Sequence, residues 1–235
     1  MKKFHQIFLD KKLPLFLQPY EILLPSHKSA FIEFVHGSVS ISSLREKWKC
    51  KNIVSLKQYF VERWNGEDSF EYHTALGNFV SSLAAYSLFC YFLSVKDRHD
   101  DNIMLLRSGH LCHIDFGHVL GSVPGNAFVQ EPDFKMTLEY IELIGGDTYF
   151  KMFLKMMVDG FLALREKKAE ILWILQIMHL DFYKVMDSKF MSEVPDNKIQ
   201  EKIEGIIALS TNALGSKFKD AMHSFGNAWK NLKKN

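Results

Sequence analysis

Two short segments of this chain carry the side chains that could do chemistry. Residues 97–102 read D-R-H-D-D-N and residues 113–118 read H-I-D-F-G-H, with an expected strand hairpin between them. Asp97, Asn102 and Asp115 would then lie on loops at the ends of strands. Carboxylate and amide oxygens are hard ligands that suit Mg²⁺, and a carboxylate within hydrogen-bond reach of a hydroxyl can orient it or accept its proton. The two segments together predict the transfer of a phosphoryl group from ATP.

The spacing of these residues resembles that of the protein kinases. In those enzymes an Asp orients the acceptor hydroxyl, and an Asn five residues later binds a second Mg²⁺. Asp97 and Asn102 repeat this step, and Asp115 stands in a D-F-G, whose Asp binds Mg²⁺ between the phosphates. D-F-G alone is a weak signal, whereas D-F-G after an upstream D-x-x-x-x-N and a hairpin is a strong one.

The order D-R-H, in place of H-R-D, resembles the phosphatidylinositol 3- and 4-kinases and their protein-kinase relatives. Around it, N-F-V-S-S-L-A-A-Y-S-L at residues 78–88 and V-K-D-R-H at residues 95–99 look like the type III phosphatidylinositol 4-kinases, especially the beta kind. Shorter matches are L-P-L at 13–15, P-Y at 19–20, F-I-E at 31–33, V-S-I at 39–41 and G-G at 145–146. The resemblance extends from about residue 4 to the C-terminus.

This resemblance implies an α+β fold that is mostly helical: a protein-kinase-like large lobe with a short remnant of the small lobe. Residues 1–35 would form the end of the small lobe and the hinge, where the main chain of Glu33 and Val35 binds adenine. Residues 36–195 would form the large lobe, with the catalytic loop at 97–102 and the activation segment at 115–137. Residues 196–235 would form C-terminal helices.

The resemblance also assigns roles within the catalytic loop and the D-F-G. Asp97 would orient or deprotonate the inositol hydroxyl, while Asn102 and Asp115 would bind Mg²⁺ (or Mn²⁺) with ATP. His99 and His118 would touch the γ-phosphate or the attacking hydroxyl, and Arg98 would tie the loop to neighbouring carboxylates or carbonyls. The alternatives are a helix-capping Asp97 and structural histidines. A zinc cluster of His99, His110, His113 and His118 is a further alternative, although its spacing fits no common zinc motif.

The activation segment would contact the lipid head group, with Pro124, Gly125 and Lys135 as candidate substrate-loop residues. In this part of the chain Lys135 is the only lysine or arginine, and its positive charge is accompanied by the negative charges of Glu131 and Asp133. Kinases that use multiply phosphorylated inositides carry a basic cluster here. The weak charge therefore favours phosphatidylinositol, with its single phosphodiester, as the substrate of a 4-kinase or of a 3-kinase that uses the unmodified lipid.

Two departures from the type III 4-kinase pattern keep alternatives open. Those enzymes usually read D-R-H-N-G-N, whereas this chain has Asp100-Asp101, for which we expect a solvated turn. His118 followed by V-L-G resembles the 3-kinases, so a phosphatidylinositol 3-kinase is the nearest alternative. A protein kinase is disfavoured by the framework at residues 78–99.

The family's glycine-rich loop, its phosphate-binding Lys and the acidic residue on the next helix are expected upstream of Met1. Without them the isolated chain would be a poor kinase or none. A truncated, catalytically inactive module that binds partners is therefore a further alternative.

Composition is consistent with a packed intracellular domain. The 235 residues are 47% hydrophobic, and the net charge of +2 does not favour nucleic acid as a partner. Three cysteines without metal spacing read as free thiols of a reducing compartment.

No signal peptide and no apolar run that could span a bilayer is expected. The protein would be cytoplasmic and would contact phosphatidylinositol membranes peripherally. By family resemblance these would be internal, Golgi-like membranes, to which other proteins could recruit the chain. An apolar stripe at residues 214–232 beside lysines could graze lipid or pack on the lobe.

Periodicity predicts the elements that position these residues. We expect strands at 21–24, ended by Pro25, and at 30–35, and a helix at 54–64. A long buried helix through residues 79–91 would direct the chain to Asp97. Short strands at 103–106 and 111–114 would be joined across R-S-G at 107–109. Helical periodicity returns at 150–179 and, beyond Pro195, up to Trp229.

Overall fold

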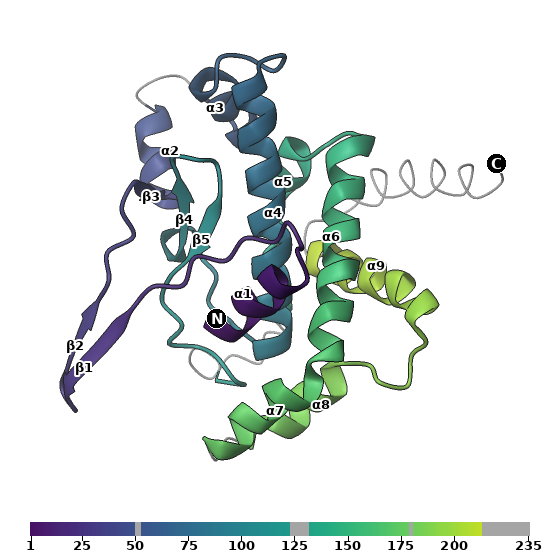
Figure 1. Cartoon of the computed structure of the whole chain (residues 1–235). Coiled ribbons are helices and arrows are strands. Elements are labelled where there is room, and N and C mark those ends of the chain that lie inside the picture. Colours follow the sequence, from purple (N-terminus) through teal and green to yellow (C-terminus); the bar gives the residue numbers. More distant parts are fainter. Residues whose placement is uncertain (50–52, 123–131, 179–180, 213–235) are drawn as a thin grey trace.

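The computed structural model describes residues 1–49, 53–122, 132–178 and 181–212 of the chain. In these ranges helices predominate, and they are accompanied by a three-stranded sheet and a separate two-stranded hairpin (Figure 1). The helices are α1 (Lys2–Asp10), α2 (Ile41–Lys49), α3 (Leu56–Arg63), α4 (Phe70–Leu93), α5 (Leu138–Leu143), α6 (Asp147–Glu166), α7 (Lys168–Ile177), α8 (Tyr183–Lys189) and α9 (Asp196–Asn212), with a short 3₁₀ turn η1 (Asp100–Asn102). The strands are β1 (Ile22–Ser26), β2 (Ser29–Ile32), β3 (Ser38–Ser40), β4 (Ile103–Leu106) and β5 (Leu111–His113). The predicted mostly helical α+β class is confirmed.

Helix α4 is the central element and leads directly to the catalytic loop. The Ser69 side chain caps its first turn by accepting a hydrogen bond from the Tyr72 amide, and Ser94 ends it in a left-handed conformation. Every residue from 79 to 92 is buried. The helix is long and apolar enough to cross a membrane by length and composition, so the expectation that no such run exists was wrong. Most of that run is buried inside the molecule, where it packs against the chain's own side chains.

Helices α6 and α1 enclose α4 on one side. Helix α6 runs alongside α4 (Figure 1), and Gly160 allows close packing, because a Cβ at this position would lie 2.6 Å from Leu88 Cδ1 of α4. Helix α1 adds Phe4 to the same core, with its ring 5.7 Å from that of Phe89. Residues 1–17 thus share a core with the helices of the predicted large lobe. The assignment of residues 1–35 to the small lobe stays a prediction.

The sheet β3-β4-β5 is antiparallel and holds the catalytic loop at one end. Ile103 pairs with His113 and Leu105 with Leu111, and β3 pairs with β4 on the other side. Gly109 closes the turn with a φ of +91°, and a Cβ at this position would lie 2.5 Å from the Ala75 carbonyl oxygen. The sheet is fixed to α4 by the Leu111 amide, which donates to Ser82 Oγ at 2.7 Å. The predicted hairpin across residues 107–109 is confirmed.

The hairpin β1-β2 extends away from the rest of the molecule (Figure 1). Both strands are exposed along their length, and the exposed apolar side chains include Leu23, Leu24 and Phe31. Strand β1 continues through Pro25 to Ser26, so the prediction that Pro25 ends it was wrong. The register shifts between Leu23 and Ser26, and such an irregularity accommodates a residue that cannot donate to the ladder.

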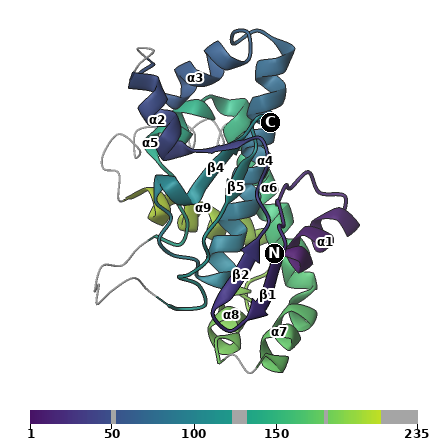
Figure 2. The ribbon, with the colours of Figure 1, turned by 90° about the vertical axis from the view of Figure 1, so that its left-hand side faces the viewer.

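Three helical segments complete the described part of the chain. Helices α7 and α8 pack together at one end of the molecule, as both views show (Figures 1 and 2). The helical region predicted at 150–179 is divided between α6 and α7, which meet at Lys167. Helix α9 packs on α6, while the predicted continuation to Trp229 lies outside the described residues. Helix α2 was not predicted; it buries Ile41, Leu44 and Trp48.

Candidate active site

Strands β4 and β5 bring the two chemistry-bearing loops together. The Ile114 amide donates to the Asn102 carbonyl at 3.0 Å, which sets Asp115 beside the end of the catalytic loop. The Asn102 Nδ2 donates to the Asp97 carbonyl at 2.9 Å, so the first and last residues of the loop are also joined. The structure therefore places Asp97, Asn102 and Asp115 at the same end of the sheet, as their spacing predicted.

Both acidic residues have a strained backbone. The φ of Asp97 is +60° and that of Asp115 is +53°, in the left-handed region that residues with a Cβ rarely adopt. Such strain persists only where surrounding contacts fix it, and it is concentrated at functional sites. In the Asp115 turn, the Gly117 amide donates to Asp115 Oδ1 at 3.0 Å. Its Phe116 ring packs edge-on against Phe89 at 5.5 Å.

Arg98 connects the two loops through carbonyl groups. Its Nε donates to the Lys96 carbonyl at 3.0 Å and its Nη1 to the Ile114 carbonyl at 2.7 Å, while its Nη2 donates to the Asp115 carbonyl. The guanidinium also lies over the Phe116 ring, 5.4 Å from the centroid. Burial lowers the pKa of Arg98, but a guanidinium stays charged throughout the working pH range. This is the geometry of a residue that positions the loops.

His99 is held between polar groups of its own loop. Its Nε2 lies 3.0 Å from Asn102 Nδ2 and 3.7 Å from Asp97 Oδ2, and its Nδ1 lies 3.5 Å from Asp101 Oδ2. Because an amide NH₂ can only donate, Asn102 Nδ2 donates to His99 Nε2, and the Nδ1 atom faces Asp101. Both amide hydrogens of Asn102 are engaged, so its oxygen is the side-chain atom that could serve as a metal ligand.

The other two histidines of the motif differ in their surroundings. His113 is buried, stacks on Tyr86 at 4.4 Å and contacts Cys90 Sγ at 3.6 Å; burial lowers its pKa well below the ordinary value. It is therefore a neutral core residue. The main-chain carbonyl of His118 accepts a hydrogen bond from the Lys96 amide at 2.8 Å. The Nδ1 atom of His118 is buried without a partner among the described residues.

The proposed zinc alternative finds no support in the described part of the chain. Within it, no group of three or more His, Cys, Asp or Glu side chains is arranged to hold a metal ion. His110 instead lies 2.9 Å from Ser108 Oγ, and its ring packs against Phe16. A kinase-type Mg²⁺ requires no such cluster, because the phosphates supply further oxygen ligands.

An ion-pair network behind the catalytic loop was missed by sequence reasoning. Arg45 of α2 donates from Nε to Asp100 Oδ2 at 2.8 Å and from Nη1 to Glu139 Oε1 at 2.8 Å. Asp100 also pairs with Lys135, and only 27% of its side chain is exposed. Burial alone would raise the pKa of Asp100, but hydrogen bonds from Lys135 and Arg45 outweigh it and lower the pKa. The expected solvated turn is therefore wrong for Asp100, although it fits Asp101, whose side chain is 67% exposed.

The predicted hinge residues lie just after β2. The Glu33 amide donates to the Glu21 carbonyl at 2.9 Å, and the Val35 carbonyl accepts from Ser38 Oγ at 2.6 Å. These two bonds engage the Glu33 amide and the Val35 carbonyl within the described part of the chain. Of the predicted substrate loop, Lys135 is mostly buried against Asp100, and Pro124 and Gly125 lie outside the described residues.

A cavity of about 340 Å³ opens beside Asp97. Its walls come from residues 95–99 at the start of the catalytic loop and just before it, from residues 132 and 134–137, and from Ser210 of α9. Lys96 Nζ donates to the Pro132 carbonyl at 3.0 Å, which joins two of these walls. Lys96 lies in the V-K-D-R-H stretch but was given no role from the sequence, and Ser210 was not singled out because no local motif marks it.

A D-x-x-x-x-N loop and a D-F-G loop on one hairpin define a kinase-type catalytic centre. A family profile described as phosphatidylinositol 3- and 4-kinase matches residues 1–183. The chain therefore belongs to the phosphatidylinositol 3- and 4-kinase family, as its motifs predicted.

Individual relatives agree with this assignment. The chain is 38% identical to phosphatidylinositol 4-kinase beta 1 of Arabidopsis thaliana over an alignment of 181 residues, which covers 74% of this chain and 16% of that protein. It is 29% identical to a phosphatidylinositol 4-kinase of Dictyostelium discoideum over 240 residues, 97% of this chain and 20% of the relative. It is 31% identical to phosphatidylinositol 4-kinase beta of Xenopus laevis over 242 residues, 97% of this chain and 29% of the relative. The chain thus spans less than a third of the length of these relatives.

Proposed function

We propose that this chain is the catalytic large lobe of a phosphatidylinositol 4-kinase, which moves the γ-phosphoryl group of ATP to the 4-hydroxyl of phosphatidylinositol. The observation that carries the proposal is the Ile114–Asn102 hydrogen bond, because it joins the loop of Asp97 and Asn102 to the turn of Asp115. The relatives that carry the name phosphatidylinositol 4-kinase support this choice over a 3-kinase.

Each site residue has a defined task in this proposal. The Asp97 carboxylate orients the inositol hydroxyl and accepts its proton as the oxygen–phosphorus bond forms and the bond to the ADP oxygen breaks. The Asn102 amide oxygen and the Asp115 carboxylate would hold Mg²⁺ or Mn²⁺, which would neutralise charge on the phosphates. Arg98 positions both loops, and His99 and His118 line the path of the transferred group. The adenine meets the main chain of Glu33 and Val35.

We also infer the setting in which this reaction takes place. The acceptor is a membrane lipid, so the catalytic end of the molecule has to approach a bilayer from the cytoplasmic side. Peripheral association with internal, Golgi-like membranes and recruitment by proteins follow from the family resemblance. Residues 97–102 as catalytic loop, 115–137 as activation segment and 1–35 as hinge region are parts of the same proposal.

Phosphorylation of phosphatidylinositol vesicles with labelled ATP and Mg²⁺ tests the proposal, with the product isomers separated by chromatography. The experiment compares this chain with a longer chain that also carries a glycine-rich loop and its Lys. Phosphatidylinositol 4-phosphate as the product supports the proposal. Product phosphorylated at the 3-hydroxyl would assign a 3-kinase, and phosphorylation of a peptide but not of lipid would assign a protein kinase. If neither chain makes product, the inactive binding module is the better interpretation.

A further inference from the structure

Lys189, the last residue of α8, lies at the C-terminal end of the central helix α4. Its Nζ donates to the Tyr91 carbonyl and, at 2.7 Å, to Ser94 Oγ, and it lies 5.0 Å from the centroid of the Tyr91 ring. The Tyr91 hydroxyl donates in return to the Lys189 carbonyl at 3.1 Å. The side chain of Lys189 is only 15% exposed. These contacts join the end of α4 to α8 at several atoms.

The sequence of α4 explains why a cation is stabilising at this place. The last carbonyl groups of a helix have no partner within the helix, and they carry the negative end of its dipole. The last turn of α4 contains no basic residue. Lys189 therefore supplies from α8 the positive charge and the hydrogen-bond donors that this end of α4 lacks.

The chain that leaves α4 is the entry to the catalytic loop, and the segment after the D-F-G holds its other side. The Leu120 amide donates to the Leu93 carbonyl at 2.9 Å. The Lys96 amide donates to the His118 carbonyl at 2.8 Å. Asp97 follows directly, with its left-handed φ of +60°. A strained residue keeps its geometry only where surrounding contacts fix it, and these contacts precede Asp97 in the chain.

The Lys189 ammonium also contacts the part of the chain that precedes α5. Asp133 Oδ1 lies 3.9 Å from Nζ. Burial lowers the pKa of Lys189, and the Asp133 carboxylate opposes this shift. Pro132 is held beside it, since its carbonyl accepts from Lys96 Nζ at 3.0 Å. Lys189 thus contacts the end of α4, the entry to the catalytic loop and Asp133 at once.

We propose that Lys189 is a positioning residue of the kinase site: its ammonium holds the entry to the catalytic loop so that the Asp97 carboxylate meets the acceptor hydroxyl. The inference rests on the proposed function, because it requires that Asp97 receives the proton of that hydroxyl. It assigns a part in catalysis to a residue outside both motifs and beyond residues 1–183, which the family profile matches. Lys189 acts through the main chain and touches neither ATP nor lipid.

Steady-state kinetics on phosphatidylinositol vesicles, in whichever form of the protein is active, test the catalytic part of the proposal. Lys189→Met removes the charge and the donors but keeps most of the volume. We expect kcat to fall by about tenfold or more, because a small displacement of a reacting group is costly. The KM for ATP should change by less than about twofold, since the proposed adenine contacts at Glu33 and Val35 are separate from this entry.

Lys168→Met is the matched control, because Lys168 forms comparable contacts where α7 meets α8. Its Nζ donates to Ser192 Oγ at 2.7 Å, pairs with Asp187 at 2.6 Å and lies 6.0 Å from the centroid of the Phe190 ring. Both substitutions should lower the free energy of unfolding, but Lys168→Met should leave kcat within about twofold of the wild type. An equal fall of kcat in both variants would reduce Lys189 to a structural contact and overturn the proposal.

Amide hydrogen exchange of the ¹⁵N-labelled 235-residue chain tests the positioning without requiring turnover. In Lys189→Met the amides of Lys96 and Leu120 should exchange at least about tenfold faster relative to that of Leu111, which Ser82 holds in the sheet. Unchanged relative exchange would overturn the proposal. Wild-type kcat in Lys189→Met would overturn it as well, while the proposed function would stand. Faster exchange in a protein that phosphorylates no lipid in any form would support the positioning by Lys189 and refute the proposed function.

Discussion

At the scale of residues, the site depends on side chains that fix other groups. Arg98 is the main example, because its guanidinium donates to carbonyls of both segments. One acceptor is the carbonyl of Lys96, just before the catalytic loop, and the others are the carbonyls of Ile114 and Asp115. Asn102 has a similar part, since its amide hydrogens hold Asp97 and His99 in place. The residues that would touch ATP and lipid are thus positioned by neighbours within the same two loops.

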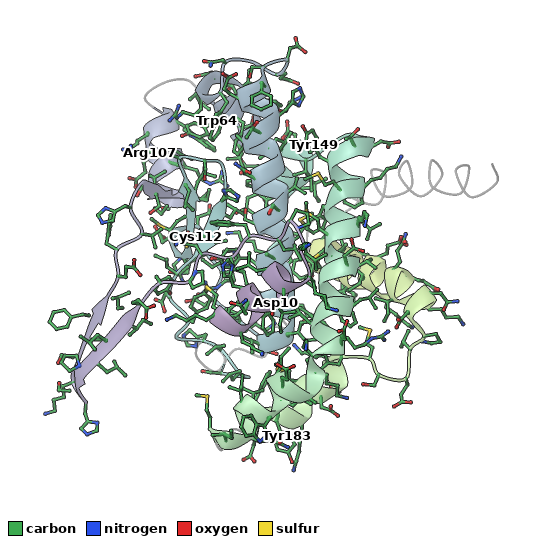
Figure 3. All side chains as sticks on the ribbon, viewed as in Figure 1. Asp10, Trp64, Arg107, Cys112, Tyr149 and Tyr183 are labelled. Atoms are coloured by element: carbon green, nitrogen blue, oxygen red, sulfur yellow. The ribbon has the colours of Figure 1, made fainter. Side chains whose placement is uncertain are left out.

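We predict that Arg98→Lys destabilises the chain by about 1–3 kcal/mol, because an ammonium cannot reproduce a planar fork that reaches three carbonyls. Denaturant unfolding measures the change. Arg107→Lys is the matched control, since this exposed residue on the β4-β5 turn (labelled in Figure 3) should tolerate the change within about 0.5 kcal/mol. Equal effects of the two substitutions would contradict the positioning role of Arg98.

The half-buried His110 and the buried His113 predict a pH dependence of stability. Burial lowers the pKa of His110 to about 4, whereas an unfolded His titrates near 6.5. Between these values the unfolded chain binds a proton that the folded chain does not, so the free energy of unfolding falls as the pH drops from about 6.5 to about 4. His110→Gln should flatten part of this slope, and His113 contributes in the same direction. Urea unfolding at several pH values measures how the free energy of unfolding changes with pH, and His36→Gln, at an exposed position, is the control. If this pH dependence is the same in His110→Gln as in the wild type, the argument is refuted.

At the scale of elements, the hairpin β4-β5 and helix α4 decide where the two loops meet. The Gly109 turn lies against Ala75, and the Leu111 amide is held by Ser82, so the hairpin is fixed to the helix at two points. Its other end carries Asn102 and Ile114. A shift of the hairpin along α4 would therefore move the candidate metal ligands.

We predict that Gly109→Ala destabilises the chain by at least about 2–3 kcal/mol. The residue has a φ of +91°, and its new Cβ would lie 2.5 Å from a main-chain oxygen of the central helix. Gly205→Ala in α9 is the control, since nothing lies within 4 Å of its Cβ position, and a gain of about 0.5–1 kcal/mol is expected there. Thermal or denaturant unfolding distinguishes the two, and a neutral Gly109→Ala would show that the turn is not tightly packed.

The sequence predicted those parts of the structure that depend on local patterns. The D-x-x-x-x-N step, the hairpin across residues 107–109 and the long buried helix could all be read from spacing and periodicity. Arg45 could not, because its partner Asp100 is 55 residues away and no pattern connects them. Asp100 itself was misjudged, since local composition favours a solvated turn and only the fold brings Arg45 and Lys135 to it.

At the scale of the whole molecule, the Arg45 network connects distant parts of the chain behind the catalytic loop. It joins α2, η1, the end of the activation segment and the first turn of α5 through Arg45, Asp100, Lys135 and Glu139. Since these groups are partly buried, their mutual attraction is screened less than that of surface pairs. The network thus ties the loop that bears Asn102 to elements on two sides.

We predict that Asp100→Asn destabilises the chain by about 1–2 kcal/mol at pH 7, because two cations lose a charged partner. The pKa of Asp100 is lowered in the folded chain, so its contribution is present above the unfolded value near 3.9 and is lost as the pH falls through the folded value. The difference between wild type and Asp100→Asn should therefore vanish at low pH. A difference that persists unchanged at pH 2 would show that charge is not its origin.

The most direct test of the central claim is the turnover of phosphatidylinositol by variants of the catalytic carboxylates, in whichever form of the protein is active. Asp97→Asn and Asp115→Asn should each lower kcat by at least about 100-fold, because one removes the proton acceptor and the other a metal ligand. Asp101→Asn, at an exposed position in the same loop, should retain activity within a few-fold. Full activity in Asp97→Asn or Asp115→Asn, in folded protein, would contradict the assignment of this site as the centre of phosphoryl transfer.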